Sequence, residues 1–277
     1  MKAPMRADRP RRGIPLRTIV PNAVTALALC SGLFGIRFAI GGEWDKAVGA
    51  VVLAAILDGL DGRIARLLNG QSRFGAELDS LSDVTAFGVA PAIILYLWVL
   101  QPLAELGTDV ERWNRYGWLF LLAYAVCGAL RLARFNANID SVEQPHKSAG
   151  FLTGVPAPAG AGLVLLPLYL WLWTEAPLLR EPWLAAPWAA AVGFLMISNL
   201  ATFSWGSLRL RSHVRLGALV VIALVFAALI SAPFPTLSVA AVLYAMMIPI
   251  SIVSYAKVKR QRAADLTRPE PPPGPGA

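Results

Sequence analysis

The stretch "DGLDGRIARLLNGQSRFGAELDSLSD" at residues 58–83 combines four aspartates with a predicted turn between two helices. It lies between two apolar runs, "AVGAVVLAAIL" at 47–57 and "VTAFGVAPAIILYLWVL" at 84–100. Its four aspartates are Asp58, Asp61, Asp79 and Asp83, and all lie at the edges of those runs. A carboxylate near hydrocarbon is costly unless something pairs with it. The stretch therefore reads as a functional site placed at a membrane boundary.

The composition around this stretch is that of a membrane protein. The chain has 277 residues, of which 56% are hydrophobic and 15% are charged, whereas soluble domains have about 25% charged residues. Apolar runs of about 20 residues, long enough to cross a bilayer, recur along it. We therefore expect an all-α polytopic membrane protein. Because the net charge of +8 lies in short loops and tails, the expected partner is the lipid bilayer and not nucleic acid.

Hydropathy predicts about eight transmembrane helices. They are residues 19–40, 46–68, 79–101, 115–135, 151–173, 185–203, 214–232 and 235–256. The corresponding division is a basic N-terminal segment at 1–18, a catalytic core at 19–203, two additional helices at 204–256, and a basic, then Pro-rich, disordered tail at 257–277. Lys and Arg gather before the first span and in every second loop. The positive-inside rule then places both termini and the aspartate stretch on the cytoplasmic face of the cell (inner) membrane.

Helical spacing orders the four acids. Asp58 and Asp61 are three residues apart, and Asp79 and Asp83 are four apart, so each pair shares a helix face. The residues "NGQS" at 69–72 predict a turn between the two helices. The result is a hairpin with two carboxylates on each inner face.

Four converging carboxylates favour hard divalent cations such as Mg²⁺, Mn²⁺ or Ca²⁺. Two cations bridged by carboxylates are a recurrent arrangement for phosphoryl transfer. Gly62 and Gly75 leave room for a bulky ligand, and Arg66 can neutralise a phosphate. From geometry alone, a cation-coupled membrane transporter remains an alternative, because acids within spans also mark ion paths.

The fixed positions read Asp58-x-x-Asp61-Gly62-x-x-Ala65-Arg66, then eight residues, then Gly75-x-x-x-Asp79-x-x-x-Asp83. This pattern resembles the signature of the CDP-alcohol phosphotransferase family. The resemblance implies a six-helix membrane core, often dimeric, with about two Mg²⁺ or Mn²⁺ ions held by the four aspartates. It also implies that Asp83 is the catalytic base. The implied ligands of the CDP-linked lipid are Asn22, Gly62, Ala65, Arg66, Ser72 and Gly75.

Further blocks resemble the phosphatidylserine synthase branch of that family. They lie at 21–36, 79–92, 130–136 and 150–162, with a looser match at 196–205. This resemblance implies transfer from CDP-diacylglycerol to L-serine, giving phosphatidylserine and CMP. It suggests that Arg134, Phe135 and Asn136 of "ARFN" bind serine. Another acceptor, such as glycerol 3-phosphate, inositol phosphate or choline, is the alternative within the family.

Overall fold

The computed structural model describes residues 16–101, 108–137, 151–203 and 212–266. Most of the predicted segment 1–18 and of the tail 257–277 lies outside these residues or outside their described side chains. The elements are α1 (Leu16–Ile40), α2 (Trp44–Leu67), α3 (Arg73–Asp83), η1 (Val84–Val89), α4 (Ala90–Leu95), η2 (Tyr96–Leu100), α5 (Thr108–Ala137), β1 (Phe151–Thr153), α7 (Ala157–Val164), α8 (Leu166–Thr174), η4 (Pro177–Arg180), α9 (Pro182–Ile197), β2 (Ala201–Phe203), α10 (Ser212–Ser231) and α11 (Pro233–Leu266).

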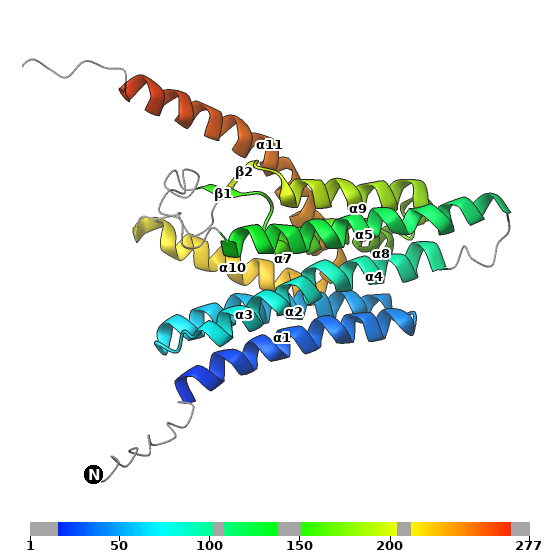
Figure 1. Ribbon diagram of the computed structural model, residues 1–277, viewed down its shortest axis with the longest axis horizontal. Helices are drawn as coiled ribbons and strands as arrows, with labels where there is room; N and C mark the ends of the chain where they lie inside the picture. The colour runs from blue at the N-terminus through cyan, green and yellow to red at the C-terminus, as the bar shows by residue number, and fades with distance from the viewer. Residues whose placement is uncertain (1–15, 102–107, 138–150, 204–211, 267–277) are drawn as a thin grey trace, which may run out of the picture.

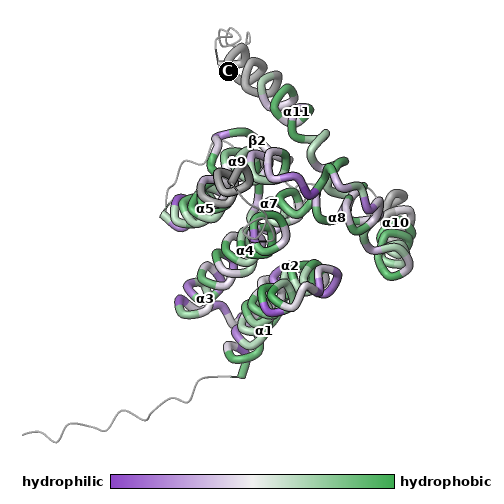
Figure 2. Tube along the Cα trace, turned by 90° about the vertical axis from the view of Figure 1, so that its right-hand side faces the viewer, coloured by the Kyte–Doolittle hydropathy of each residue, from purple (hydrophilic) through white to green (hydrophobic). Residues whose placement is uncertain are grey.

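Long helices lie side by side along the longest axis of the molecule (Figure 1). α1 packs along α2, α5 packs along α9, and α3 to η2 form one rod between these pairs. Viewed along the helices, hydrophobic residues predominate in α1, α2, α4 and α10, whereas α3 also carries many hydrophilic residues (Figure 2). Large side chains such as Trp98, Phe87 and Tyr124 are buried where the rod meets its neighbours. The core therefore lies around the helix that follows the aspartate stretch.

The predicted class, an all-α polytopic membrane protein, is confirmed. Among the described residues, four helices are long and apolar enough to cross a membrane, and the pair α7 and α8, bent by 41°, makes a possible fifth. The four are Leu16–Ile40, Arg73–Leu100, Tyr116–Ala137 and Pro233–Ala256. Helices also stand at the other predicted positions, but α2 carries several charges and α9 has only 16 residues. The count of eight spans stays a prediction.

The prediction of helical spans at 151–173 and 185–203 is wrong at residues 151–153 and 201–203. Residues 151–153 and 201–203 form an antiparallel strand pair, with Phe151 opposite Phe203. Pro156 caps the following helix, which starts at Ala157, because proline lacks the N–H that an earlier helical turn would need. Gly154 has φ +74°, and its N–H donates to the Leu200 carbonyl at 2.8 Å. Hydropathy does not detect such a long-range pairing.

At the opposite end of the bundle, Arg180 links three elements. Its Nε donates to the Trp98 carbonyl at 2.9 Å, and its guanidinium lies 5.6 Å from the centre of the Trp171 ring. These contacts join η4 to α8 and to the end of η2. In Figure 1 the turn between α2 and α3 lies at the other end of the bundle, together with β1 and β2.

Candidate active site

The turn between α2 and α3 folds as its sequence predicts. Asn69 adopts a positive φ of 48°, which asparagine tolerates better than most residues. Ser72 is the N-cap of α3, and its hydroxyl accepts a hydrogen bond from the Gly75 N–H at 3.0 Å. Gly70 lies so close to α1 that a Cβ there would come within 1.9 Å of the Arg17 carbonyl oxygen. Pro21, four residues after Arg17, has no N–H to donate to that carbonyl.

The hairpin brings carboxylates of both helices together. Asp58, Asp61 and Asp79 each offer an oxygen, and these three atoms lie within 4.8 Å of one another. Asp83 interacts with Asp58. Its Oδ1 is buried and has no hydrogen-bond partner in the part of the chain that the structure describes. Burying a carboxylate oxygen without a partner costs free energy. A ligand bound to Asp83 Oδ1 would remove this cost.

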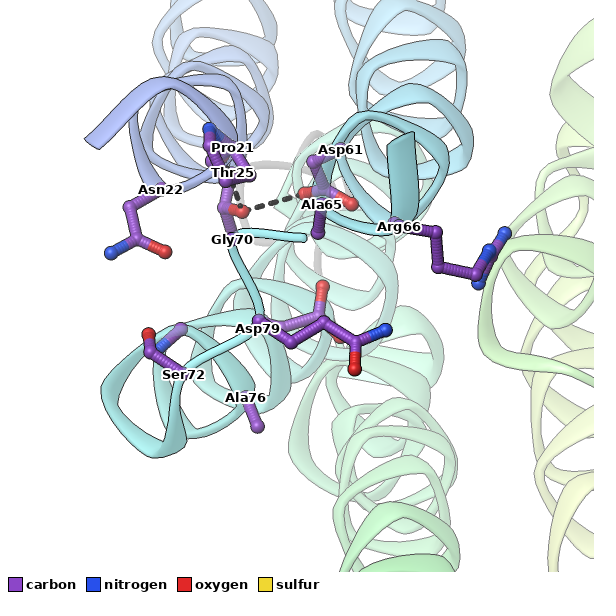
Figure 3. Close-up of a pocket in the computed structure, with 13 residues that line it drawn as sticks. Pro21, Asn22, Thr25, Asp61, Ala65, Arg66, Gly70, Ser72, Ala76 and Asp79 are labelled. Atoms are coloured by element: carbon purple, nitrogen blue, oxygen red, sulfur yellow. Dashed lines mark hydrogen bonds between the residues drawn. The ribbon is translucent and has the colours of Figure 1, made fainter. Parts of the chain in front are cut away.

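α1 supports the cluster from the side. The Thr25 hydroxyl lies 2.7 Å from Asp61 Oδ2 and donates to it, and the Ser82 hydroxyl donates to the Thr25 carbonyl at 3.3 Å. Figure 3 shows Thr25 and Asp61 pointing toward one another, while Arg66 extends away from them. The sequence prediction missed Thr25, although its position three residues after Asn22 puts both on one face of α1.

A cavity of about 280 Å³ opens beside the acids. Its lining residues are Pro21, Asn22, Thr25, Asp61, Gly62, Ala65, Arg66, Gly70, Gln71, Ser72, Gly75, Ala76 and Asp79. All six residues predicted to bind the CDP-linked lipid thus line one cavity. A Cβ on Gly75 would come within 2.6 Å of Asn22 Oδ1, whereas a Cβ on Gly62 would meet only Arg66 Nη1, at 3.9 Å. Gly75 lets Asn22 approach α3, and Gly62 leaves free space.

The chemistry of these residues fits a divalent cation. The ligand atoms are carboxylate oxygens, which hard cations prefer. Among the described residues the one ion pair joins Lys46 to Glu43, at the far end of α2. None of the four aspartates forms an ion pair with lysine or arginine within the described residues, although Arg131 interacts electrostatically with Asp83. A bound cation would compensate the remaining negative charge.

The three residues of "ARFN" that we predicted to bind serine do not share one site: each has different surroundings. Arg134 donates from Nη1 to Asn199 Oδ1 at 2.9 Å and from Nη2 to the Ser198 carbonyl at 3.3 Å. It thus ties the end of α5 to the end of α9. Asn136 Nδ2 donates to Ser80 Oγ at 2.8 Å, which ties α5 to α3, and Phe135 is 55% exposed.

Arg131, one turn before Arg134, lies closer to the acids. It interacts electrostatically with Asp83 and with Tyr244 of α11. Its Nε is buried and finds no partner among the described residues. The resemblance of "ARFN" to the family branch pointed to Arg134. Spacing along one helix does not say which of the two arginines faces the acids.

Comparisons with known proteins agree with this geometry. The pattern of the CDP-alcohol phosphatidyltransferase family matches residues 18–197. The chain belongs to the CDP-alcohol phosphatidyltransferase family. A second pattern, CDP-alcohol phosphatidyltransferase 2, matches residues 213–249, so the last two helices also have counterparts among such enzymes.

Three relatives of this CDP-alcohol phosphatidyltransferase are each named CDP-diacylglycerol–serine O-phosphatidyltransferase. The protein of that name from Mycobacterium tuberculosis strain H37Rv is 38% identical over 246 residues, 89% of this chain and 82% of the relative. One from Mycobacterium leprae is 38% identical over 244 residues, 88% of this chain and 77% of the relative. One from Helicobacter pylori strain J99 is 39% identical over 140 residues, 50% of this chain and 53% of the relative.

Proposed function

We propose that this membrane protein transfers the phosphatidyl group of CDP-diacylglycerol to L-serine, releasing CMP. The observation that carries the proposal is the convergence of Asp58, Asp61 and Asp79 at the edge of a cavity lined by Arg66 and Gly62. The chemistry needs a phosphate site beside a cluster of carboxylates, and the hairpin supplies both. The shared name of the relatives supports the choice of serine.

The donor enters the cavity between α1, α2 and α3. Gly62 leaves space for the pyrophosphate to approach the backbone of α2. Arg66 is the positively charged residue in the lining of this cavity. Its guanidinium pairs with a phosphate oxygen of the donor. Asn22 and Ser72 lie on the α1 and α3 sides of the cavity and offer polar groups to the cytidine.

Asp58, Asp61, Asp79 and Asp83 hold the divalent cations, which we take to be two Mg²⁺ or Mn²⁺ ions. When bound, such ions stabilise charge on the attacking and leaving oxygens. Asp83 accepts the proton of the serine hydroxyl. The serine oxygen forms a bond to the lipid-bearing phosphorus, and the bond from that phosphorus to CMP breaks. CMP leaves with the bonding electron pair.

Serine needs a cation for its carboxylate. The aspartates repel a carboxylate, and Arg66 is assigned to the donor. Arg131 is the better placed of the two arginines in "LRLARFN", because it lies beside Asp83 with a buried, unpaired Nε. Arg134 retains free N–H groups beyond the two it uses and, with Phe135 and Asn136, forms the outer wall of the serine site.

The same proposal places the reaction at the cytoplasmic face of the cell membrane. The basic loops next to the hairpin support that orientation through the positive-inside rule. A homodimer, which the family resemblance implies, stays a prediction.

An acceptor panel tests the proposal. Purified protein in vesicles containing CDP-diacylglycerol is given serine, glycerol 3-phosphate, inositol phosphate or choline, and both CMP and lipid products are measured. Only serine should release CMP together with a new lipid. Release of CMP with glycerol 3-phosphate and not with serine would support the same reaction type with a different acceptor. A cation-coupled transporter, the alternative from another class, would release no CMP with any acceptor.

A further inference from the structure

The helix that carries Asp79 and Asp83 changes its winding directly after Asp83. η1, residues Val84–Val89, is π-helical, and the Ala90 N–H donates to the Thr85 carbonyl five residues earlier. π-helical segments are rare and often occur at functional sites. The orientation of Asp83 toward its surroundings therefore depends on how η1 is held.

Pro91 creates a weak point in this segment. In an α-helix the N–H of residue 91 would bond to the Phe87 carbonyl, but proline has no N–H. Phe87 is 1% exposed, so its carbonyl is far from water. A buried carbonyl without a partner costs free energy. A donor from another helix can therefore stabilise this carbonyl.

Tyr124 of α5 is that donor. Its hydroxyl donates to the Phe87 carbonyl at 2.6 Å, and the side chain is fully buried. The backbone of Tyr124 is itself held, because a Cβ on Gly193 of α9 would come within 2.9 Å of the Tyr124 Cα. The tyrosine therefore has little freedom to move away from η1.

η1 is also confined on its other side. A Cβ on Gly32 of α1 would come within 2.7 Å of the Ala86 Cα. The segment thus lies between α1 and α5, with packing on one side and a directional hydrogen bond on the other. Packing alone restricts translation, whereas the hydrogen bond also restricts rotation about the helix axis.

The same face of α5 continues to the acids. Tyr124 and Arg131 are seven residues apart, which is two helical turns and the same face. Tyr124 contacts Phe87, and Arg131 interacts with Asp83, four residues before Phe87. One face of α5 therefore meets both η1 and the acid next to it.

We propose that Tyr124 is a positioning residue, whose hydroxyl holds η1 in the rotation that aims Asp83 at the serine hydroxyl. The proposal rests on the role of Asp83 in the proposed function. Misplacement of a reacting group by about 1 Å costs up to about a hundredfold in rate. The donor cavity between α1, α2 and α3 contains no residue of η1, so we expect donor binding to change little.

Tyr124→Phe tests the proposal because it removes one oxygen and keeps the ring. We expect kcat to fall about tenfold, which corresponds to about 1.4 kcal/mol, while KM for both substrates stays within about twofold. Ser31→Ala is the matched control. It removes another buried hydroxyl that donates to a carbonyl of a neighbouring helix, that of Ala50 at 2.8 Å, away from η1. This control should keep the wild-type kcat.

Hydrogen exchange supplies a readout without catalysis. Amides of residues 84–90 and 92–95 should exchange faster in Tyr124→Phe and at the wild-type rate in Ser31→Ala. In a Pro91→Ala background, residue 91 has an N–H for the Phe87 carbonyl. Tyr124→Phe should then lower kcat by no more than about twofold, since the lost donor is replaced.

Three results would overturn the proposal: unchanged exchange in Tyr124→Phe, an unchanged kcat, or an equal loss in Ser31→Ala. A wild-type protein that does not form phosphatidylserine would instead overturn the proposed function. The exchange comparison would still decide whether the hydroxyl holds the segment.

Discussion

At Gly62 the missing side chain leaves space that faces the cavity, and this space distinguishes a ligand site from a structural contact. A Cβ there would meet only Arg66 Nη1 at 3.9 Å, and a Cβ on Gly59 of the same helix would meet nothing within 4 Å. Both glycines can therefore become alanine without a clash in the free protein. Only Gly62 lines the cavity.

Gly62→Ala should therefore leave folding intact and raise KM for CDP-diacylglycerol about tenfold or more, because the methyl group occupies the path of the pyrophosphate. Gly59→Ala should keep the wild-type KM. Initial rates over a range of donor concentrations measure both variants. Equal KM values in the two variants would remove Gly62 from the donor site.

Substitutions of Arg131 and Arg134 in α5 should have different effects in the same kind of assay. Losing a charge-assisted bond to a buried carboxylate costs about 1.5–3 kcal/mol. Arg131→Ala should therefore raise KM for serine by about ten- to a hundredfold, with little change for the donor. Arg134→Ala should mainly lower the unfolding temperature, because it cuts the tie to Ser198 and Asn199. The opposite pattern would show that Arg134, and not Arg131, binds the carboxylate of serine.

At the scale of elements, the strand pair shapes the end of the bundle that carries the turn between α2 and α3. It joins the segment before α7 to the segment after α9, and the Thr202 hydroxyl donates to the Gly154 carbonyl at 2.8 Å. Gly154 permits this join, since its φ is +74° and a Cβ would come within 2.4 Å of the Met196 carbonyl oxygen.

Gly154→Ala should therefore destabilise the protein by about 2 kcal/mol or more, because both the left-handed backbone and the clash oppose a methyl group. Gly162→Ala in α7 is the matched control, since a Cβ there meets nothing within 4 Å. It should leave the stability unchanged or raise it slightly. Thermal unfolding in one detergent compares the two. An unfolding temperature of Gly154→Ala equal to that of the control would contradict the strained join.

Local and long-range features differ in how far the sequence predicts them. Spacing along a helix suffices to put Asp58 beside Asp61 and Asp79 beside Asp83, and a turn signal suffices to join the two helices. The hydrogen bond from Thr25 to Asp61 spans 36 residues, and the strand pair joins segments 50 residues apart. Such contacts depend on how helices pack, which periodicity does not encode.

At the scale of the whole molecule, the two ends of the bundle should face opposite sides of the membrane. Gln71 lies in the turn beside the acids, and Leu178, 56% exposed, lies in η4 at the other end. Single cysteines at these positions, with Cys30 and Cys127 replaced, should react with an impermeant reagent from opposite sides of intact cells. We expect Leu178→Cys to react from outside. Labelling of both from one side would contradict the placement of the two ends on opposite sides, and labelling of Gln71→Cys from outside would contradict the cytoplasmic orientation of the hairpin.

The most direct test of the proposed reaction is the stoichiometry and metal dependence of serine transfer in purified vesicles. With CDP-diacylglycerol and labelled serine, the protein should release one CMP for each labelled phosphatidylserine formed. A chelator should stop both, Mg²⁺ or Mn²⁺ should restore both, and Asp79→Asn should abolish both in the presence of metal. CMP release that continues without serine or in the chelator, or full activity of Asp79→Asn, would contradict a metal-dependent transfer at the aspartate hairpin.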